Sequence, residues 1–437
     1  MSASPEAAAQ QRPKLANQRP IMLVCLAVFG LMTGQQMVNP ILAPLARELG
    51  FSELALGVVM FVGASGVVVA GSFWGRRAMA WGHRPVLLTS LIGATVGLLA
   101  FAVVAQIGLS GALPTAVAYA LVILSRGLVF GLAWAATPVT AQSYVADMTT
   151  GEAERVRGMS IFSAAQGLGL AVGPAVGGLL SIGGLLPPMY VAPAILAVIA
   201  VLVALKVPKP EAHAKRPPMS KVSPFDRRMW PFLTIGFGLY LAMTIVLMTV
   251  GFLLQDRLGL GANETGTVTG MVTLAGAGMI VIVQVVAVPR LDWTSLRLMR
   301  VGALLMTLGM LVVAVAPSGL LIGVGVALLG AGLGFGMPGI MSAPSLLATP
   351  TEQASVAGLV SATVATTFMI GPLLGNGLYE VGQAAPYVFG TVMLAALLLF
   401  ALLHPGVKQT AAGSAAEAGP AGAPAEAHTD SEPSEAR

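Results

Sequence analysis

The sequence predicts an all-α membrane protein with twelve transmembrane helices in two six-helix, pseudo-symmetric halves. Three observations predict this fold class: an apolar composition, a regular succession of long apolar segments, and an internal repeat. Of 437 residues, 56% are hydrophobic and only 9% are charged, whereas a soluble domain carries roughly 25% charged residues. Apolar segments of about 20 residues, each long enough to cross a hydrocarbon core of about 30 Å, alternate with short loops that hold nearly all the charge.

We expect the chain to begin in a polar leader and to end in a disordered tail. The apolar run that begins at Ile21 is too long for a cleaved signal peptide, and no small-residue cleavage site closes it. The Ala/Gly/Pro/Glu-rich tail has the composition of a disordered segment. The expected segments are a leader (1–20), a first half (21–206), a cytoplasmic linker (207–228), a second half (229–404) and a cytoplasmic tail (405–437).

Each half is expected to hold six spans, as judged from the length and polarity of its apolar segments. In the first half they cover about 21–45, 54–75, 86–107, 115–142, 158–181 and 187–206. In the second half they cover about 230–254, 265–288, 299–317, 319–345, 355–378 and 385–403.

The distribution of basic residues predicts that both termini are cytoplasmic, in line with the positive-inside rule. Only Arg47 and Arg257 fall on loops that would face outside. Topology therefore accounts for the formal net charge of +5 without a nucleic-acid partner. The single Cys25 excludes an intramolecular disulfide and a cysteine metal site. The inside loops and the linker hold Arg76, Arg77, Arg84, Arg155, Arg157, Lys206, Lys209, Lys215, Arg216, Lys221, Arg227, Arg228, Arg290, Arg297 and Arg300.

An internal repeat relates the two halves. Leu49-Gly50, which precedes span 2, recurs as Leu258-Gly259 before span 8, and Gly173-Pro174-x-x-Gly177 in span 5 recurs as Gly371-Pro372-x-x-Gly375 in span 11. Two six-span units joined by a basic linker suit a transporter whose halves rock around a central cavity.

Span 5 is predicted to be a tightly packed, bent helix. Gly169, Gly173 and Gly177 recur every four residues, so they share one helical face that a neighbouring backbone can approach closely. Pro174 removes a backbone donor and should kink the helix. Such a break survives in lipid only against protein or a cavity, which indicates a gate element. The alternative is ordinary small-residue packing between membrane helices.

Three stretches resemble the major facilitator superfamily, over roughly residues 20–405. They are the loop from Trp74 to Pro85, the stretch from Gln142 to Thr149 at the end of span 4, and the Gly-Pro stretch of span 5. Within the superfamily, the sequence is most similar to the drug:proton antiporters that include the tetracycline exporters. The resemblance implies a secondary transporter with alternating access.

The first stretch departs from the family pattern, because Met79 and Ala80 stand where the family usually has an acidic and a basic residue. The family loop is thought to hold the two halves together on the cytoplasmic side by charge pairing and helix-end dipoles. Arg76, Arg77 and Arg84 remain, so a pair between one of these gating arginines and Asp147 is an expected substitute. The alternative is that the arginines serve topology alone.

Arg126 in span 4 is the one fixed charge away from the ends of the predicted spans, and it lies near mid-depth of the membrane. A charge there is costly unless it faces an aqueous cavity or a partner, so it is a candidate substrate-binding residue. It resembles the intramembrane arginine of the family, although the following Gly131 is five residues away and the family usually has four. The alternative role is structural pairing with backbone carbonyls.

Neutral amides supply the other candidate substrate-binding groups. Gln35, Gln36 and Asn39 precede a proline in span 1, as suits a helix that lines a cavity. Gln142 and Tyr240 are further candidates for the same lining. Gln166, Gln284 and Asn376 could complete this lining, and each of these side chains has an alternative role in bonds between helices.

The sequence offers little for energy coupling, since no Asp or Glu lies in the middle of a predicted span. Asp147 at the membrane edge is the chosen candidate for a proton-coupling group, and His83 and His404 also lie at boundaries. No nucleotide-binding loop is present, so ATP does not drive the protein directly.

Together, these features predict a secondary transporter, not an enzyme, in the bacterial inner membrane. It would export a small amphipathic or anionic molecule against protons, with no cofactor, no metal and a single protomer as the working unit. Export of a siderophore-type metabolite and proton-coupled import on the same scaffold remain alternatives, and a membrane receptor or enzyme is the alternative class. Fold alone does not identify the substrate.

Overall fold

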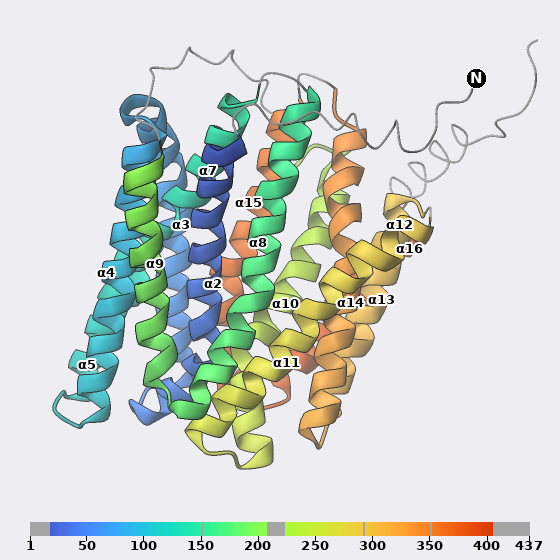
Figure 1. Cartoon of the computed structure of the whole chain (residues 1–437). Coiled ribbons are helices and arrows are strands. Elements are labelled where there is room, and N and C mark those ends of the chain that lie inside the picture. The colour runs from blue at the N-terminus through green and yellow to red at the C-terminus, as the bar shows by residue number, and fades with distance from the viewer. Residues whose placement is uncertain (1–17, 150–151, 208–222, 292, 350–351, 405–437) are drawn as a thin grey trace, which may run out of the picture.

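The computed structural model describes residues 18–149, 152–207, 223–291, 293–349 and 352–404, and these ranges contain helices but no β-strand. The helices form one upright bundle (Figure 1). Twelve of its segments are long and apolar enough to cross a membrane. The predicted all-α membrane fold with twelve spans is therefore confirmed.

The first six spans begin and end within a few residues of the predicted boundaries. Span 4 is built from four consecutive elements, whereas the others are continuous α-helices that carry at most a short terminal turn. The spans are α2 (Gln18–Glu48), α3 (Glu53–Trp81), α4 (His83–Leu109), the fourth span with α5 (Thr115–Val122), η1 (Ile123–Val129), α6 (Phe130–Trp134) and α7 (Ala136–Asp147), then α8 (Glu152–Leu180) followed by η2 (Ser181–Gly183), and α9 (Leu186–Lys206).

The last six spans follow the same pattern, and here the eighth span is built from three elements. The spans are α10 (Trp230–Leu258), the eighth span with α11 (Ala262–Ile282), η3 (Val283–Ala287) and α12 (Val288–Leu291), α13 (Ser295–Val315), α14 (Gly319–Leu346), α15 (Gln353–Val381) and α16 (Ala385–Leu403).

Helix ends carry the expected local signals. The hydroxyls of Ser52, Thr294 and Ser318 accept backbone N–H groups at the N-termini of α3, α13 and α14. α10 ends at Gly259, whose φ of 61° is readily adopted by glycine. These caps satisfy backbone groups that a helix end otherwise leaves unpaired, so they define where the chain turns back into the bundle.

Two spans contain π-helical turns, which the apolar pattern did not predict. η1 and η3 are the π-helical segments of the fourth and eighth spans. In contrast, α8 continues as a single α-helix through Pro174. π turns inside α-helices are frequent at functional sites, so the residues of η1, Arg126 among them, are candidates for a functional role.

The bundle has two ends, which we name from Figure 1. The lower end is where α2 stops at Glu48 and α3 begins at Glu53, and the upper end is where α3 stops at Trp81 and α10 begins at Trp230. Helices of the first six spans pack against helices of the last six through α3 with α15 and through α8 with α11. Close approaches within these two pairs lie toward the lower end, where a Cβ at Gly57 would be 2.9 Å from the Pro372 carbonyl oxygen and one at Gly270 would be 2.5 Å from the Cα of Gly178.

The glycine face of α8 packs against α2, as the spacing predicts. A Cβ at Gly169 would be 2.6 Å from the Met32 Cβ, one at Gly173 would be 2.4 Å from the Gln36 Cβ, and one at Gly177 would be 2.0 Å from the Met37 carbonyl oxygen. The predicted close backbone approach is thus confirmed. It joins two helices of the first six spans, while Gly178 supplies the contact to α11. The gating role of Gly169, Gly173, Pro174 and Gly177 stays a prediction.

Candidate functional site

Arg126 is a buried cation for which the described residues provide no polar partner at two of its nitrogens. It lies on η1, its side chain is 4% exposed, and its guanidinium carbon stands 4.4 Å from the centre of the Phe130 ring. Its Nε and Nη2 are buried and make no hydrogen bond within the part of the chain that the structure describes. Buried polar groups are normally paired, and a charge at this depth is costly, so Arg126 is the strongest candidate for a group that receives a ligand.

The π turn explains the unusual spacing after Arg126. A π-helical turn takes five residues between hydrogen-bonded groups where an α-helix takes four, so it accommodates one additional residue. Gly131 packs directly on α3, where an added Cβ would be 2.5 Å from the Gly63 carbonyl oxygen. The extra residue between Arg126 and Gly131 therefore fits without displacing this helix contact.

The amides predicted on span 1 form a small group on α2. The Asn39 Nδ2 donates to the Gln36 Oε1 at 2.8 Å, and Gln36 is 7% exposed. The Gln35 Oε1 and the Asn39 Oδ1 are buried without a hydrogen bond from any described residue. Two amide oxygens on α2 and the guanidinium of Arg126 on η1 thus have unused hydrogen-bonding capacity among the described residues. No described polar contact joins Arg126 to the α2 amides.

The other predicted lining residues lie in different environments. Tyr240 on α10 is 7% exposed, and Gln142 on α7 is exposed. Gln284 on η3 points its Nε2 at the Met337 sulfur, 3.3 Å away. Asn376 on α15 is fully buried, and neither of its amide atoms has a partner among the described residues. The sequence analysis preferred the span 1 amides to Asn376, yet Asn376 is the one of these side chains whose two amide atoms both lack a partner among the described residues.

At the upper end, Asp147 pairs with a histidine. The Asp147 Oδ2 lies 3.3 Å from the Nε2 of His83, which is 6% exposed and packs its ring edge against Tyr144. The expected pair between Asp147 and Arg76, Arg77 or Arg84 is absent among the described contacts. Arg84 instead donates to the backbone carbonyl of Ala204 on α9.

The other two gating arginines also differ from expectation. Arg76 is exposed and takes part in no described hydrogen bond or ion pair. Arg77 has its guanidinium carbon 5.2 Å from the Phe73 ring and 4.5 Å from the Trp81 ring. Both side chains are exposed on α3, and neither forms an ion pair with Asp147 among the described contacts. Their predicted gating role stays a prediction.

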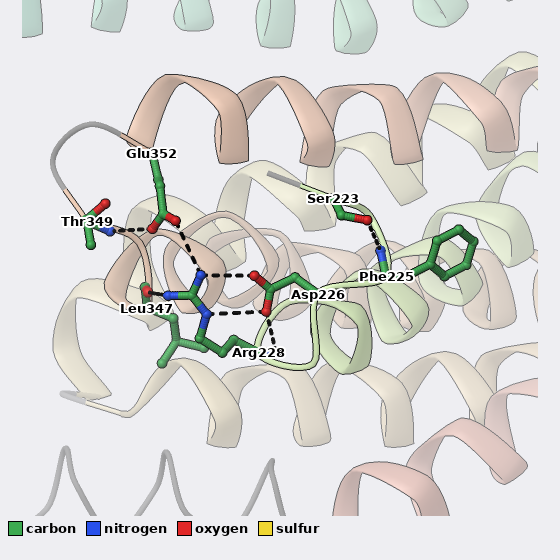
Figure 2. A network of polar contacts seen from close by, with 7 residues as sticks. All are labelled: Ser223, Phe225, Asp226, Arg228, Leu347, Thr349 and Glu352. Atoms are coloured by element: carbon green, nitrogen blue, oxygen red, sulfur yellow. Dashed lines mark hydrogen bonds and ion pairs between the residues drawn. The ribbon is translucent and has the colours of Figure 1, made fainter. Parts of the chain in front are cut away.

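Figure 2 shows an exposed polar network at the upper end of the last six spans. The Arg228 Nη2 donates to the Asp226 Oδ2 at 2.9 Å and to the Glu352 Oε1 at 3.3 Å. The hydrogen bond from Arg228 holds the pKa of Asp226 below its ordinary value. The backbone amide of Thr349 lowers the pKa of Glu352, with a smaller effect from Arg228. The network fixes the start of α10 against the loop before α15.

The lower end contains a cluster that the sequence analysis missed. Arg47 on α2 pairs with Asp256 on α10 and, at 2.8 Å, with the Glu53 carboxylate on α3. The Tyr379 hydroxyl on α15 donates to the Asp256 Oδ2 at 2.7 Å, and Gln255 accepts from Arg47 at 3.4 Å. We call Arg47, Glu53, Gln255, Asp256 and Tyr379 the lower-end cluster. It brings together four helices from both sets of six spans.

The repeat contained the signal for this cluster. Arg47 stands two residues before Leu49-Gly50, and Asp256 stands two residues before Leu258-Gly259. Opposite charges therefore occupy equivalent positions at the same end of spans 1 and 7. Two helix ends that carry such charges can pair when the halves meet, and this arrangement is what the structure shows.

The described residues show no second candidate site for a substrate or a metal ion. A hollow of about 590 Å³ at the lower end is lined by Glu48, Leu109, 183–187 and 261–264, and none of the predicted site residues borders it. The described residues contain no group of three or more His, Cys, Asp or Glu side chains that could hold a metal ion. Cys25 is buried and unpaired.

Twelve helices long and apolar enough to cross a membrane define a polytopic membrane protein, and one of the spans holds a buried arginine with two nitrogens that lack a partner among the described residues. The chain belongs to the Major Facilitator Superfamily, whose model matches residues 24–365. Members of this superfamily are transporters and not enzymes.

Similar proteins support this assignment over most of the chain. The class C tetracycline resistance protein of Escherichia coli is 26% identical over 84% of this chain and 92% of its own length. The class G protein of Vibrio anguillarum is 27% identical over 90% of this chain and 98% of its own length. The solved nucleoside transporter NupG has the same fold, with a TM-score of 0.69 at 13% identity over 88% of this chain and 99% of its own.

A second solved structure, of the human organic anion transporter MFSD10, shares the fold with a TM-score of 0.60 and 17% identity over 89% of this chain and 100% of its own. These likenesses show the fold alone.

Proposed function

We propose that the protein exports a small amphipathic or anionic molecule, a drug or a metabolite, across the bacterial inner membrane by proton antiport with alternating access. The observation that carries the proposal is Arg126, a nearly fully buried guanidinium with two unpaired nitrogens on a π turn. A cation in a low-dielectric site attracts a negative or strongly polar substrate group. The names of the tetracycline resistance relatives support the choice of an exporter.

Alternating access requires that one end of the bundle closes while the other opens. The lower-end cluster supports an assignment of this structure to the state that is closed at the lower end. With the termini in the cytoplasm, as the basic loops favour, that state is open toward the cytoplasm and ready to receive a substrate for export. The two sets of six spans, residues 21–206 and 229–404, would be the units that move.

For proton coupling, the pair of His83 and Asp147 supports Asp147 as the group that exchanges protons. The pair joins the carboxylate to a group whose ordinary pKa lies near neutrality, about 6.5. A proton shared by this pair would be released or bound at the end that faces the cytoplasm. The remaining substrate contacts would come from the α2 amides, with Gln142 and Tyr240 completing the proposed lining.

The proposal is tested with purified protein in liposomes under an imposed pH gradient, with a panel of tetracyclines, organic acids and siderophores as substrates. Wild-type protein should drive at least one of them against its gradient, and a protonophore should abolish this movement. Arg126→Ala should reduce transport by roughly tenfold or more, since a hydrogen bond to a charged group contributes about 1.5–3 kcal/mol. Arg126→Lys keeps the positive charge but lacks the planar, two-pronged guanidinium, so its transport rate shows whether the charge alone is sufficient.

Arg227→Gln is the control for loss of one positive charge, because Arg227 is an exposed arginine at the upper end without a described polar contact. It should transport like the wild type. Movement that ignores the pH gradient would overturn proton coupling, and movement in the direction of the protons would identify an importer. Unchanged transport by Arg126→Ala would remove Arg126 from the substrate site.

A further inference from the structure

One exposed face of α3 combines an apolar stripe with a positively charged end. Val69, Phe73, Arg77 and Trp81 recur every four residues, so they lie on the same face of the helix. Val69 is 73% exposed, Phe73 is 41% exposed and Trp81 is 47% exposed. The stripe is therefore uncovered in this structure over the upper part of α3.

The depth of Arg77 matches that of a lipid headgroup. It lies 24 residues beyond Glu53, the first residue of α3, which is about 36 Å at 1.5 Å per residue. The hydrocarbon core is about 30 Å thick. Phe73 thus lies at the inner edge of the hydrocarbon, and Arg77 lies about one helical turn further out, among the headgroups.

The guanidinium of Arg77 lies against two aromatic rings, and no described residue offers it a carboxylate partner. Its central carbon lies 5.2 Å from the Phe73 ring centre and 4.5 Å from the Trp81 ring centre. No described residue forms an ion pair or a hydrogen bond with it. The aromatic contacts reduce the conformational freedom of the side chain, and the N–H groups remain available to a phosphate, which a guanidinium binds with two parallel hydrogen bonds.

Trp74 fixes this part of α3 to the rest of the protein. Its indole N–H donates to the Leu132 carbonyl at 2.8 Å, and Ala78 on the next turn is buried. The helix is therefore anchored through the adjacent face, which carries Trp74 and Ala78, and leaves the face with Arg77 outward. Arg76, next to Arg77, adds a second exposed positive charge.

We propose that the stripe of Val69, Phe73, Arg77 and Trp81 binds an anionic phospholipid, with its phosphate on Arg77 and an acyl chain along Phe73 and Val69. The positive charge and the depth fit an anionic headgroup, and the exposed apolar residues below it fit the chain. This lipid site does not depend on the proposed transport activity.

The test is native mass spectrometry of the purified full-length protein in detergent, titrated with phosphatidylglycerol or phosphatidylcholine. The wild type should bind one phosphatidylglycerol more tightly than any phosphatidylcholine. Arg77→Gln should weaken this tightest site by roughly fivefold, since one basic residue near a membrane surface contributes about that factor. Arg227→Gln, the same charge change at an exposed arginine without ring contacts, should leave it unchanged.

A second variant keeps the test decisive if Arg77→Gln folds poorly. Phe73→Leu combined with Trp81→Leu keeps the charge and removes both rings, so it should weaken the same site by a smaller factor. Equal losses in Arg77→Gln and Arg227→Gln would overturn the proposal, because binding would then follow net charge alone. Full competition by inorganic phosphate would also overturn it and show a site for free anions.

Discussion

The two ends of the bundle are held together differently. At the lower end, polar contacts join the first six spans to the last six: Arg47 pairs with Asp256, and the Leu54 amide donates to Glu380 at 3.0 Å. At the upper end, the contacts described above stay within one set of six spans, as in the pairs of His83 with Asp147 and Arg228 with Glu352. Under the proposed alternating access, the lower end is therefore the one that must separate.

The lower-end cluster differs from a simple surface ion pair because one partly buried arginine pairs with two carboxylates at once. Arg47 bonds two carboxylates from different helices, and its guanidinium carbon lies 5.0 Å from the Phe252 ring centre. Its side chain is only 26% exposed. Networks of this kind contribute more than the median exposed pair, which contributes about 0–1 kcal/mol. Opening the lower end must break this network.

The largest expected effect comes from removing Arg47. Arg47→Gln leaves Asp256 and Glu53 near each other without the cation, so the closed lower end should lose stability relative to the open one. We expect a maleimide to react roughly tenfold faster with Asn376→Cys, in a Cys25→Ser background, because the fully buried Asn376 position is uncovered when α15 leaves α3.

The matched control is Arg257→Gln. Arg257 lies next to Asp256 in sequence but donates to the carbonyls of Val313, Ala314 and Ala316, all within the last six spans. Its loss should leave the labelling rate at position 376 unchanged. Equal acceleration in both variants would show that general loosening, and not the cross-bundle pair, controls access.

A slightly smaller effect is expected from the glycine contact between α8 and α11. Gly270→Ala places a Cβ 2.5 Å from the Gly178 Cα, so the two helices must move apart. The lower end should then open more often, and the labelling rate at Asn376→Cys should rise several-fold.

Gly177→Ala provides the comparison within one set of six spans. Its Cβ would be 2.0 Å from the Met37 carbonyl oxygen on α2. We expect it to lower the thermal unfolding temperature without raising the labelling rate, because the strained contact does not cross the bundle. A raised rate in Gly177→Ala would contradict the distinction between the two contacts.

The smallest effect concerns pH and the network of Figure 2. The pKa values of Asp226 and Glu352 are held below their ordinary range near 4. Their stabilising contribution is therefore present above about pH 4 and is lost as pH falls through the lowered values. Because these groups are solvent-exposed, the change should be small. Thermal unfolding of wild type and Arg228→Gln should differ slightly at pH 7 and converge near pH 3; a constant difference would contradict it.

The sequence predicted the spans well because membrane crossing depends on local apolar length. The boundaries of α9 and α16 differ from expectation by no more than one residue. α3 instead continues to Trp81, beyond the predicted end at about residue 75, because the helix does not stop where the apolar segment gives way to polar residues. The glycine face of α8 was also predictable, since spacing along one helix determines which residues share a face.

Contacts between distant helices were harder to predict. The pair of Arg47 with Asp256 needs the relative placement of α2 and α10, which only the repeat hinted at. Asp147 pairs with His83 because His83 begins α4 beside α7, while Arg77 lies on the exposed face of α3. The π turn at Arg126 escaped prediction because hydrophobic periodicity does not distinguish a single π turn from an α-helical one.

The central claim is that the two ends open and close in turn, and paired spin-label distances test it most directly. One pair, at Glu48→Cys and Glu264→Cys, spans the lower end; the other, at Lys206→Cys and Leu346→Cys, spans the upper end, and all four side chains are exposed. Under an imposed proton gradient with a transported substrate, the lower pair should lengthen in the molecules in which the upper pair shortens. Transport with both distances unchanged, or changing in the same direction, would contradict alternating access.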